Sequence, residues 1–97
     1  YVTSKHAIIG LTKNIASVYR ADNIRSVAVA PGSIETNIGN SLKNPDKKGM
    51  NALTQYVAEG PLGEANDIAN VVAFLASDEG KFVNGTVVTV DGGWTGA

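Results

Sequence analysis

Two residues at the start of the chain have the chemistry and the spacing of a proton-transfer pair. Tyr1 carries a phenol, Lys5 carries an ammonium, and they stand four residues apart. An amphipathic pattern continues from them, so we expect both on one face of a helix, one turn apart. A cation beside a phenol favours the phenolate, and such a group can exchange a proton with a carbonyl or an alcohol oxygen. For the isolated pattern, a half-buried Tyr beside a solvated Lys is the alternative interpretation.

The elements that must position this pair follow from the spacing of the apolar residues. A helix is predicted from about Tyr1 to Tyr19, and the pair lies along its core-facing side. That side consists of Ala7, Ile8, Leu11, Ile15, Val18 and Tyr19. The apolar run 24–30 predicts a strand covered on both faces, which Pro31-Gly32 ends.

The second half of the chain repeats this order of elements. Asn66 or Asp67 is expected to cap a second helix, and the segment 77–80 to end it. Its core-facing side consists of Ile68, Val71, Val72, Leu75 and Ala76. A second strand is predicted over 86–91, after an Asn84-Gly85 turn.

These elements predict an α/β fold with two parallel strands and a right-handed crossover. Ligands bind beyond the carboxyl ends of such strands, so the segment 32–36 is expected beside a ligand. Two strands leave the first one with an unpaired edge. We therefore expect the chain to be the second part of a doubly wound parallel sheet, unstable or molten as an isolated monomer. Its first residue is Tyr rather than Met, which agrees with a missing N-terminal half.

Composition excludes several other classes of protein. The chain has 97 residues, which is at most one small domain, with a net charge of −1 and no cysteine. We expect no nucleic-acid partner and no membrane partner, because basic residues do not cluster and no apolar run approaches about 20 residues. No metal site is predicted, since His6 is the only histidine and the carboxylates form no cluster. A cytoplasmic location is expected.

Further motifs follow the Tyr–Lys pair in a fixed order. They are Ile24-Arg25, Val29-Ala-Pro-Gly-Ser-Ile-Glu-Thr36, Pro61-Leu-Gly-Glu64, Phe74-Leu-Ala-Ser77 and Val90-Asp-Gly-Gly93. With the opening pair, this series resembles the C-terminal half of a classical short-chain dehydrogenase/reductase, over essentially all 97 residues. The resemblance implies the last two strands and flanking helices of a Rossmann fold. It makes residues 1–97 the C-terminal half of one domain, with 37–60 as the substrate lid.

The resemblance also implies roles for particular residues. Tyr1 would be the general acid/base, and Lys5 would favour its phenolate and bind the nicotinamide ribose of NAD or NADP. The cofactor-binding turn would consist of Pro31, Gly32, Ile34 and Thr36. The Ile34 backbone would pair with the nicotinamide carboxamide, and the Thr36 hydroxyl with the carboxamide or a nearby phosphate. The alternative for this turn is an ordinary strand end.

The implied function is an NAD(P)-dependent oxidoreductase that interconverts a ketone and a secondary alcohol. Its substrate would be a small molecule, and the pattern is similar to glucose dehydrogenases and 3-oxoacyl-carrier-protein reductases. The family implies a homo-oligomer, a dimer or tetramer, formed through helix 1–19 and the C-terminal helix and strand. Two alternatives stay open: a truncated, non-catalytic fragment that only self-associates, and an inactive relative. One departure is Val27, where the family commonly has Asn.

Overall fold

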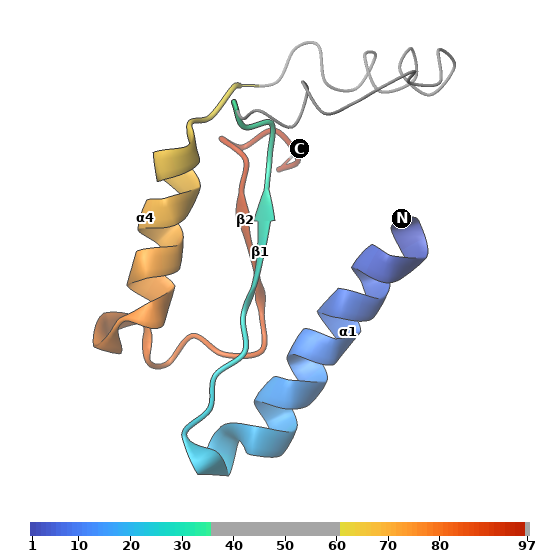
Figure 1. Cartoon of the computed structure of the whole chain (residues 1–97), viewed down its shortest axis with the longest axis vertical. Helices are drawn as coiled ribbons and strands as arrows, with labels where there is room; N and C mark the ends of the chain where they lie inside the picture. The colour runs from blue at the N-terminus through green and yellow to red at the C-terminus, as the bar shows by residue number, and fades with distance from the viewer. Residues whose placement is uncertain (36–60, 97) are drawn as a thin grey trace.

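The computed structural model describes residues 1–35 and 61–96, and it places two helices on opposite sides of a pair of strands (Figure 1). The elements are α1 (Val2–Tyr19), a short 3-10 helix (Arg20–Asp22), β1 (Ala28–Pro31), α4 (Ala65–Ala76), a second 3-10 helix (Asp78–Gly80) and β2 (Val87–Val90). The two strands are parallel, with Ala28 opposite Val87 and Pro31 opposite Val90. The predicted order of elements and the parallel pairing are confirmed. The predicted lid at 37–60 lies outside the described residues.

The helix α1 has the predicted length, but only part of its predicted core-facing side lies against the strands: Ile8 faces them and Ile15 is half-buried. Its buried residues are Thr12 and Ala16, and the Thr12 hydroxyl donates to the Ile8 carbonyl at 2.8 Å. Leu11 and Val18, predicted to face the core, are each 58% exposed. Small side chains allow α1 to come close to the loop before β2, and an added methyl on Gly85 would lie 3.2 Å from Ala16 Cβ. The apolar residues of α1 therefore lie on two faces.

The strand β1 begins later and ends later than predicted. The expected run 24–30 pairs with β2 only from Ala28, and the ladder includes Pro31. Before the strand, Ser26 hydrogen-bonds to Asn84 and Gly85 and does not join the ladder with β2. Its N–H donates to Asn84 Oδ1 at 2.8 Å, and its carbonyl accepts the Gly85 N–H at 2.8 Å. Pro31 is tolerated in the ladder because the N–H groups of Ala28 and Gly32 donate toward β2, whereas the nitrogen of Pro31 faces away from it.

The cap of helix α4 lies two to three residues earlier than predicted. Glu64 occupies the cap position, so neither Asn66 nor Asp67 does. Asp67 acts from within the first turn, where its carboxylate accepts the Glu64 N–H at 2.8 Å. An acidic residue in the first turn also stabilises the helix through its dipole. The predicted end at 77–80 is confirmed by the short 3-10 helix there.

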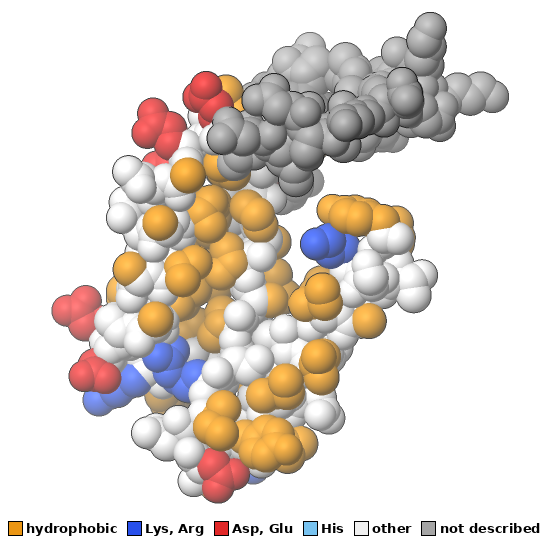
Figure 2. Space-filling model, in the orientation of Figure 1, with side chains coloured by type: hydrophobic (Ala, Val, Ile, Leu, Met, Phe, Trp, Pro, Cys, Tyr) orange, Lys and Arg blue, Asp and Glu red, His pale blue; other side chains and the backbone are white. Residues whose placement is uncertain are grey.

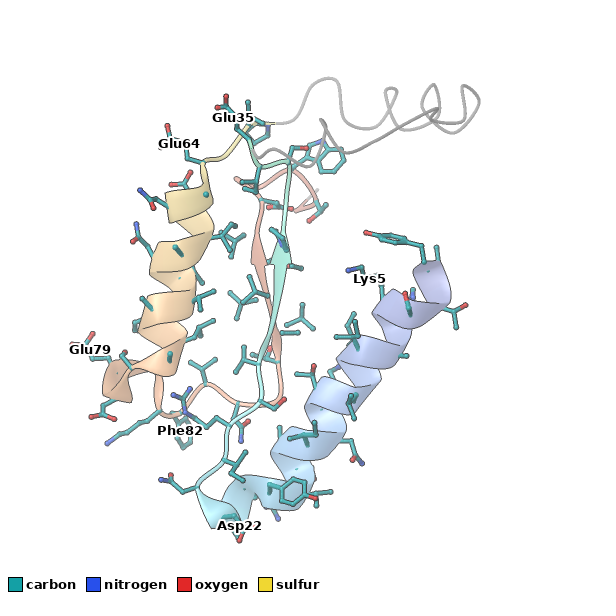
Figure 3. The ribbon with its side chains drawn as sticks, viewed as in Figure 1. Lys5, Asp22, Glu35, Glu64, Glu79 and Phe82 are labelled. Carbon is teal, nitrogen blue, oxygen red and sulfur yellow. The ribbon has the colours of Figure 1, made fainter. Side chains whose placement is uncertain are left out.

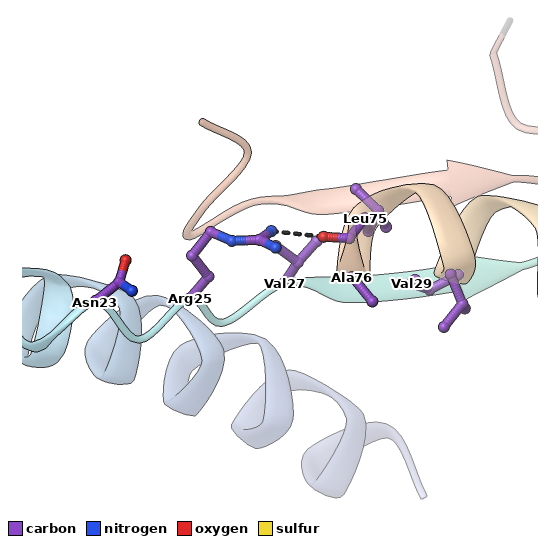
Figure 4. Close-up of a pocket in the computed structure, with 7 residues that line it drawn as sticks. Asn23, Arg25, Val27, Val29, Leu75 and Ala76 are labelled. Carbon is purple, nitrogen blue, oxygen red and sulfur yellow. Dashed lines mark hydrogen bonds between the residues drawn. The ribbon is translucent and has the colours of Figure 1, made fainter. Parts of the chain in front are cut away.

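One arginine holds the carboxyl end of α4 in place. Arg25 Nη1 donates to the carbonyls of Leu75 at 2.6 Å and Gly80 at 3.0 Å, and Nη2 lies 3.4 Å from the Ser77 carbonyl. Figure 4 shows the guanidinium reaching from the segment before β1 to the end of this helix. These contacts supply donors for carbonyls that the helix leaves unpaired at its end.

The described residues bury few apolar side chains. Among them, Ala16 and Leu75 are the only hydrophobic side chains below a tenth exposed. Apolar side chains are visible at the surface of both helices and between them (Figure 2). The two strands have helices over both faces, but each helix covers only part of its face. None of the described helices is long and apolar enough to cross a membrane.

Candidate functional site

The predicted proton-transfer pair sits at the first turn of α1. Tyr1 is the residue that precedes the helix, and its carbonyl accepts the Lys5 N–H at 3.0 Å and the Ser4 hydroxyl at 2.8 Å. Lys5 Nζ lies 5.3 Å from the centroid of the Tyr1 ring, within the range of a cation–π contact. The pair is therefore brought together as predicted. The ring itself is 91% exposed.

A cavity of about 340 Å³ separates this pair from the strands. Its polar groups come from Tyr1 and Lys5, and Pro31 closes it at the carboxyl end of β1. The remaining wall is apolar: Ile8, Ile9, Ala28, Val29, Ala30 and Val87. Figure 3 shows Lys5 extending from α1 toward the strands. A phenol and an ammonium thus face an apolar space near the end of a parallel strand, where ligands of open α/β sheets bind.

The turn after β1 is fixed by backbone hydrogen bonds to the segment before α4. Gly63 N–H donates to the Ser33 carbonyl at 2.8 Å, and Glu35 N–H donates to the Gly63 carbonyl at 2.9 Å. This parallel bridge pairs Ile34 with Gly63. It uses the backbone groups on either side of Ile34, so the N–H and carbonyl of Ile34 itself have no backbone partner within 1–35 and 61–96. A ligand with an amide group could take both.

A second cavity, of about 410 Å³, lies between the carboxyl ends of the strands and the start of α4. Ile34 lines this cavity, with Asp67 and Asp91 as its charged groups. Its other lining residues are Ser33, Pro61, Leu62, Gly63, Val90 and Gly92. The residues predicted to bind a cofactor therefore divide between two cavities. Tyr1, Lys5 and Pro31 line the first, and Ile34 lines the second; Gly32 lines neither, and Thr36 lies outside the described residues.

Asp91, just beyond β2, is the residue of this region whose ionisation the surroundings change most clearly. Hydrogen bonds from the Thr95 hydroxyl and the Thr95 N–H, with smaller contributions from the backbone at Gly93 and Trp94, hold the pKa of Asp91 below its usual range. Sequence reasoning gave Asp91 no part in the site. The signal was present, since Asp followed by Gly-Gly is typical of a turn closed by the carboxylate.

Other polar residues do not extend the site. His6 Nδ1–H donates to the Val2 carbonyl at 2.9 Å, a contact within its own helix. No group of three potential metal ligands occurs among the residues that the structure places. The groove beside Arg25 in Figure 4, about 350 Å³, lies at the other end of α4, and its wall is mostly apolar. The guanidinium there is occupied by backbone carbonyls.

Comparison with known proteins places nearly the whole chain in one family. Residues 1–95 match a family model described as enoyl-(acyl carrier protein) reductase. A 3beta-hydroxysteroid dehydrogenase from Eggerthella lenta is 44% identical over 96 residues, which cover 98% of this chain and 37% of that protein. The chain thus spans less than half the length of this curated relative.

Solved structures match the fold over the full chain. A putative 2-deoxy-D-gluconate 3-dehydrogenase from Agrobacterium tumefaciens, with bound NADP, is 37% identical with a TM-score of 0.79; the match covers all of this chain and 39% of that one. A 4-hydroxyisoleucine dehydrogenase complexed with NADH and succinate is 34% identical with a TM-score of 0.76, covering 100% and 38% of the two chains. The two strands and their helices correspond to one part of these larger structures.

Proposed function

Because the chain belongs to the classical short-chain dehydrogenase/reductase family, we propose that the protein is an NAD(P)-dependent oxidoreductase that interconverts a ketone and a secondary alcohol. The observation that carries this proposal is the Tyr1–Lys5 pair, whose ammonium lies 5.3 Å from the ring centroid beside the end of β1. The pair supplies a proton donor and a cation on the wall of an apolar cavity. That is the combination that carbonyl reduction requires of a protein.

The polar groups that line the site fit a nicotinamide dinucleotide. The ammonium of Lys5 suits the hydroxyls of a ribose, and the backbone N–H and carbonyl of Ile34 suit a carboxamide. Pro31 and Gly32 form the turn that leads to Ile34, and the Thr36 hydroxyl stays a predicted contact. The NADP-bound and NADH-bound structures of similar proteins support this choice of cofactor. Both NAD and NADP remain in the proposal.

The cofactor, when bound, supplies the two-electron chemistry by giving or taking a hydride at its nicotinamide ring. Tyr1 moves the accompanying proton. In reduction its hydroxyl donates that proton to the oxygen that was the carbonyl oxygen, and in oxidation its phenolate accepts the proton of the alcohol. Lys5 stabilises the phenolate through its positive charge. The apolar side chains of Ile8, Ile9 and the strand residues line the space beside this exchange.

The test is the substitution Tyr1→Phe in the protein expressed from its complete gene. We expect kcat to fall by about 10²- to 10⁴-fold, because the proton donor is lost while the ring remains. The affinity for NADH or NADPH, measured by fluorescence titration, should stay within about twofold of the wild type, because Lys5 and the turn are intact. Tyr19→Phe is the matched control, since it removes a hydroxyl from the same helix at a position outside the cavity. Unchanged turnover in Tyr1→Phe would exclude this mechanism.

A non-catalytic fragment that only self-associates is the second candidate. The open apolar face of α1, with Leu11 and Val18 each 58% exposed, favours it. Intact mass on the purified protein separates the two candidates. A mass of 10.0 kDa without saturable binding of NADH or NADPH supports the fragment. A much larger mass with saturable binding supports the enzyme.

The partners follow the same proposal. The substrate is a small ketone or secondary alcohol, for which glucose-dehydrogenase-like and 3-oxoacyl-carrier-protein-reductase-like substrates stay predictions. A second copy of the chain is proposed to cover the Leu11 and Val18 face of α1, with another contact through α4 and β2, in a dimer or tetramer. The cytoplasmic location also stays a prediction.

A further inference from the structure

The turn after β2 is closed by one carboxylate that accepts several hydrogen bonds. Asp91 Oδ1 accepts the Gly93 N–H at 2.9 Å, and Oδ2 accepts the Thr95 N–H at 3.0 Å together with the Thr95 hydroxyl. Hydrogen bonds to an ionised carboxylate are stronger than those between neutral groups. The backbone at Asp91 is therefore held at a defined place by its own side chain.

The turn after β1 rests directly on that backbone. A methyl group added at Gly32 would lie 2.7 Å from Asp91 Cβ and 2.8 Å from Asp91 Cα, so the two chains are as close as a glycine allows. The Gly32 N–H also donates to the Val90 carbonyl at 3.0 Å. Any shift of the Asp91 backbone must therefore move Gly32, because no side chain between them could absorb the change.

The same closed turn also contacts the segment before α4. A methyl group added at Gly92 would lie 2.6 Å from Pro61 Cγ, and Gly92 has a φ of +66°, which favours glycine. Pro61 leads into Gly63, the residue bridged to Ile34. The closed turn thus touches both segments that the bridge joins, the turn after β1 and the segment before α4.

We propose that Asp91 is a positioning residue for the nicotinamide site: its closed turn fixes Gly32 and, through Pro61 and Gly63, the backbone N–H and carbonyl of Ile34. This inference rests on the proposed function for the identity of the ligand. Asp91 needs no contact with the cofactor in this role. The chain positions Tyr1 and Lys5 separately, on α1, so Asp91 should govern cofactor affinity rather than proton transfer.

The test compares Asp91→Ala, Asp91→Asn and Thr95→Val with the wild type, all in the protein expressed from its complete gene. We expect Asp91→Ala to weaken NADH or NADPH binding by at least about tenfold, since displacements near 1 Å can have effects of this size. Asp91→Asn and Thr95→Val retain part of the hydrogen bonding and should show smaller losses. At saturating cofactor, kcat should fall much less than affinity, which is the opposite of the pattern expected for Tyr1→Phe. Glu79→Ala is the control, because it removes an exposed carboxylate far from the turn.

Amide hydrogen exchange gives a second readout that needs no cofactor. Protection of the Gly32 and Glu35 amides should fall in Asp91→Ala, while protection in the middle of α1 stays unchanged. If the wild type binds neither NADH nor NADPH, the proposed function fails, and exchange still tests the positioning. If the wild type binds but Asp91→Ala binds equally well with equal protection at Gly32, the role of Asp91 is refuted. Should Asp91→Ala not fold, Thr95→Val decides by the same two measurements.

Discussion

The contacts of Arg25 explain why this position requires a guanidinium. Its nitrogens donate to the carbonyls of Leu75, Ser77 and Gly80, at the end of α4 and in the 3-10 helix that follows it. A planar fork with five donors can satisfy several carbonyls at once, whereas an ammonium on a single stem cannot match their spacing. The side chain is partly buried, so carbonyls that lose this partner are not all resolvated.

The substitution Arg25→Met should lower the free energy of unfolding by about 2 kcal/mol, because it keeps the apolar stem and removes a charged donor from several carbonyls. Arg25→Lys should recover only part of this loss. Urea unfolding of the complete protein measures both effects. Arg20→Met is the matched control, since Arg20 is an exposed arginine on the same segment. If Arg25→Met and Arg20→Met lowered the free energy of unfolding equally, the stabilising role of the Arg25 contacts would be contradicted.

The ionisation of Asp91 makes a small part of the stability dependent on pH. Its pKa is lowered in the folded protein, first by the Thr95 hydroxyl, so the ionised form stabilises the fold. That stability is present above the ordinary Asp pKa of about 3.9 and is lost as the pH falls through the lower folded value. Asp67, which lines the same cavity as Asp91, is present in both the wild type and an Asp91→Asn variant, so a comparison of the two isolates Asp91.

The matching experiment is urea unfolding of the wild type and Asp91→Asn at a series of pH values. We expect the difference between their unfolding free energies to be constant from neutral pH down to about pH 5, and to shrink below about pH 4 as Asp91 becomes protonated. A difference that grows on acidification would mean that the neutral carboxyl is the stabilising form.

In the helix α1, the sequence determines the length of the element more clearly than its buried side. Its length and its Tyr–Lys pair could be predicted, because spacing alone fixes which residues lie one turn apart. Its buried side could not, because apolar residues occur on two faces and the closest approach to the strands uses the small residues Thr12 and Ala16. Apolar residues occur on both faces, and the close approach of Ala16 to Gly85 shows which face packs.

A substitution on the outward face of α1 tests whether this face forms a contact between copies of the protein. Leu11→Asp should weaken self-association of the complete protein by at least about 2 kcal/mol per interface, because a charge would replace an apolar contact. Sedimentation equilibrium measures the change. Ser17→Asp adds the same charge on the predicted polar side and should leave the assembly intact. Unchanged association in Leu11→Asp would remove this face from the proposed interface.

For the other elements as well, some features could be predicted from the sequence and others could not. The parallel pairing of β1 and β2 followed from the order of elements, while the start of β1 depended on contacts of Ser26 with Asn84 and Gly85 that no pattern reveals. The part played by Asp91 was also hidden, because it arises from a contact between backbones nearly sixty residues apart in sequence. Residue types predict local structure well, but contacts between turns that are distant in sequence can be identified only in the three-dimensional structure.

For the molecule as a whole, the small buried area limits what these 97 residues can do alone. Within the described parts, only Ala16 and Leu75 are nearly buried hydrophobic side chains, and two strands rarely make an independently stable sheet. We expect the isolated 97-residue polypeptide to lack a cooperative thermal transition in calorimetry and to bind a dye specific for exposed apolar surface. A sharp transition with a normal enthalpy would contradict this expectation, and the complete protein serves as the control.

The bridge between Ile34 and Gly63 has a consequence for how such a protein can diversify. It joins the two ends of a stretch of sequence at a single backbone contact, independently of which residues lie between them. Doubling the length of a closed loop changes its closure free energy by only about 0.6 kcal/mol. We expect a change in the number of residues between these ends to leave the pairing of β1 with β2 intact. We therefore expect relatives of this chain to differ in the number of residues between positions 34 and 63 while they keep the proton-transfer pair.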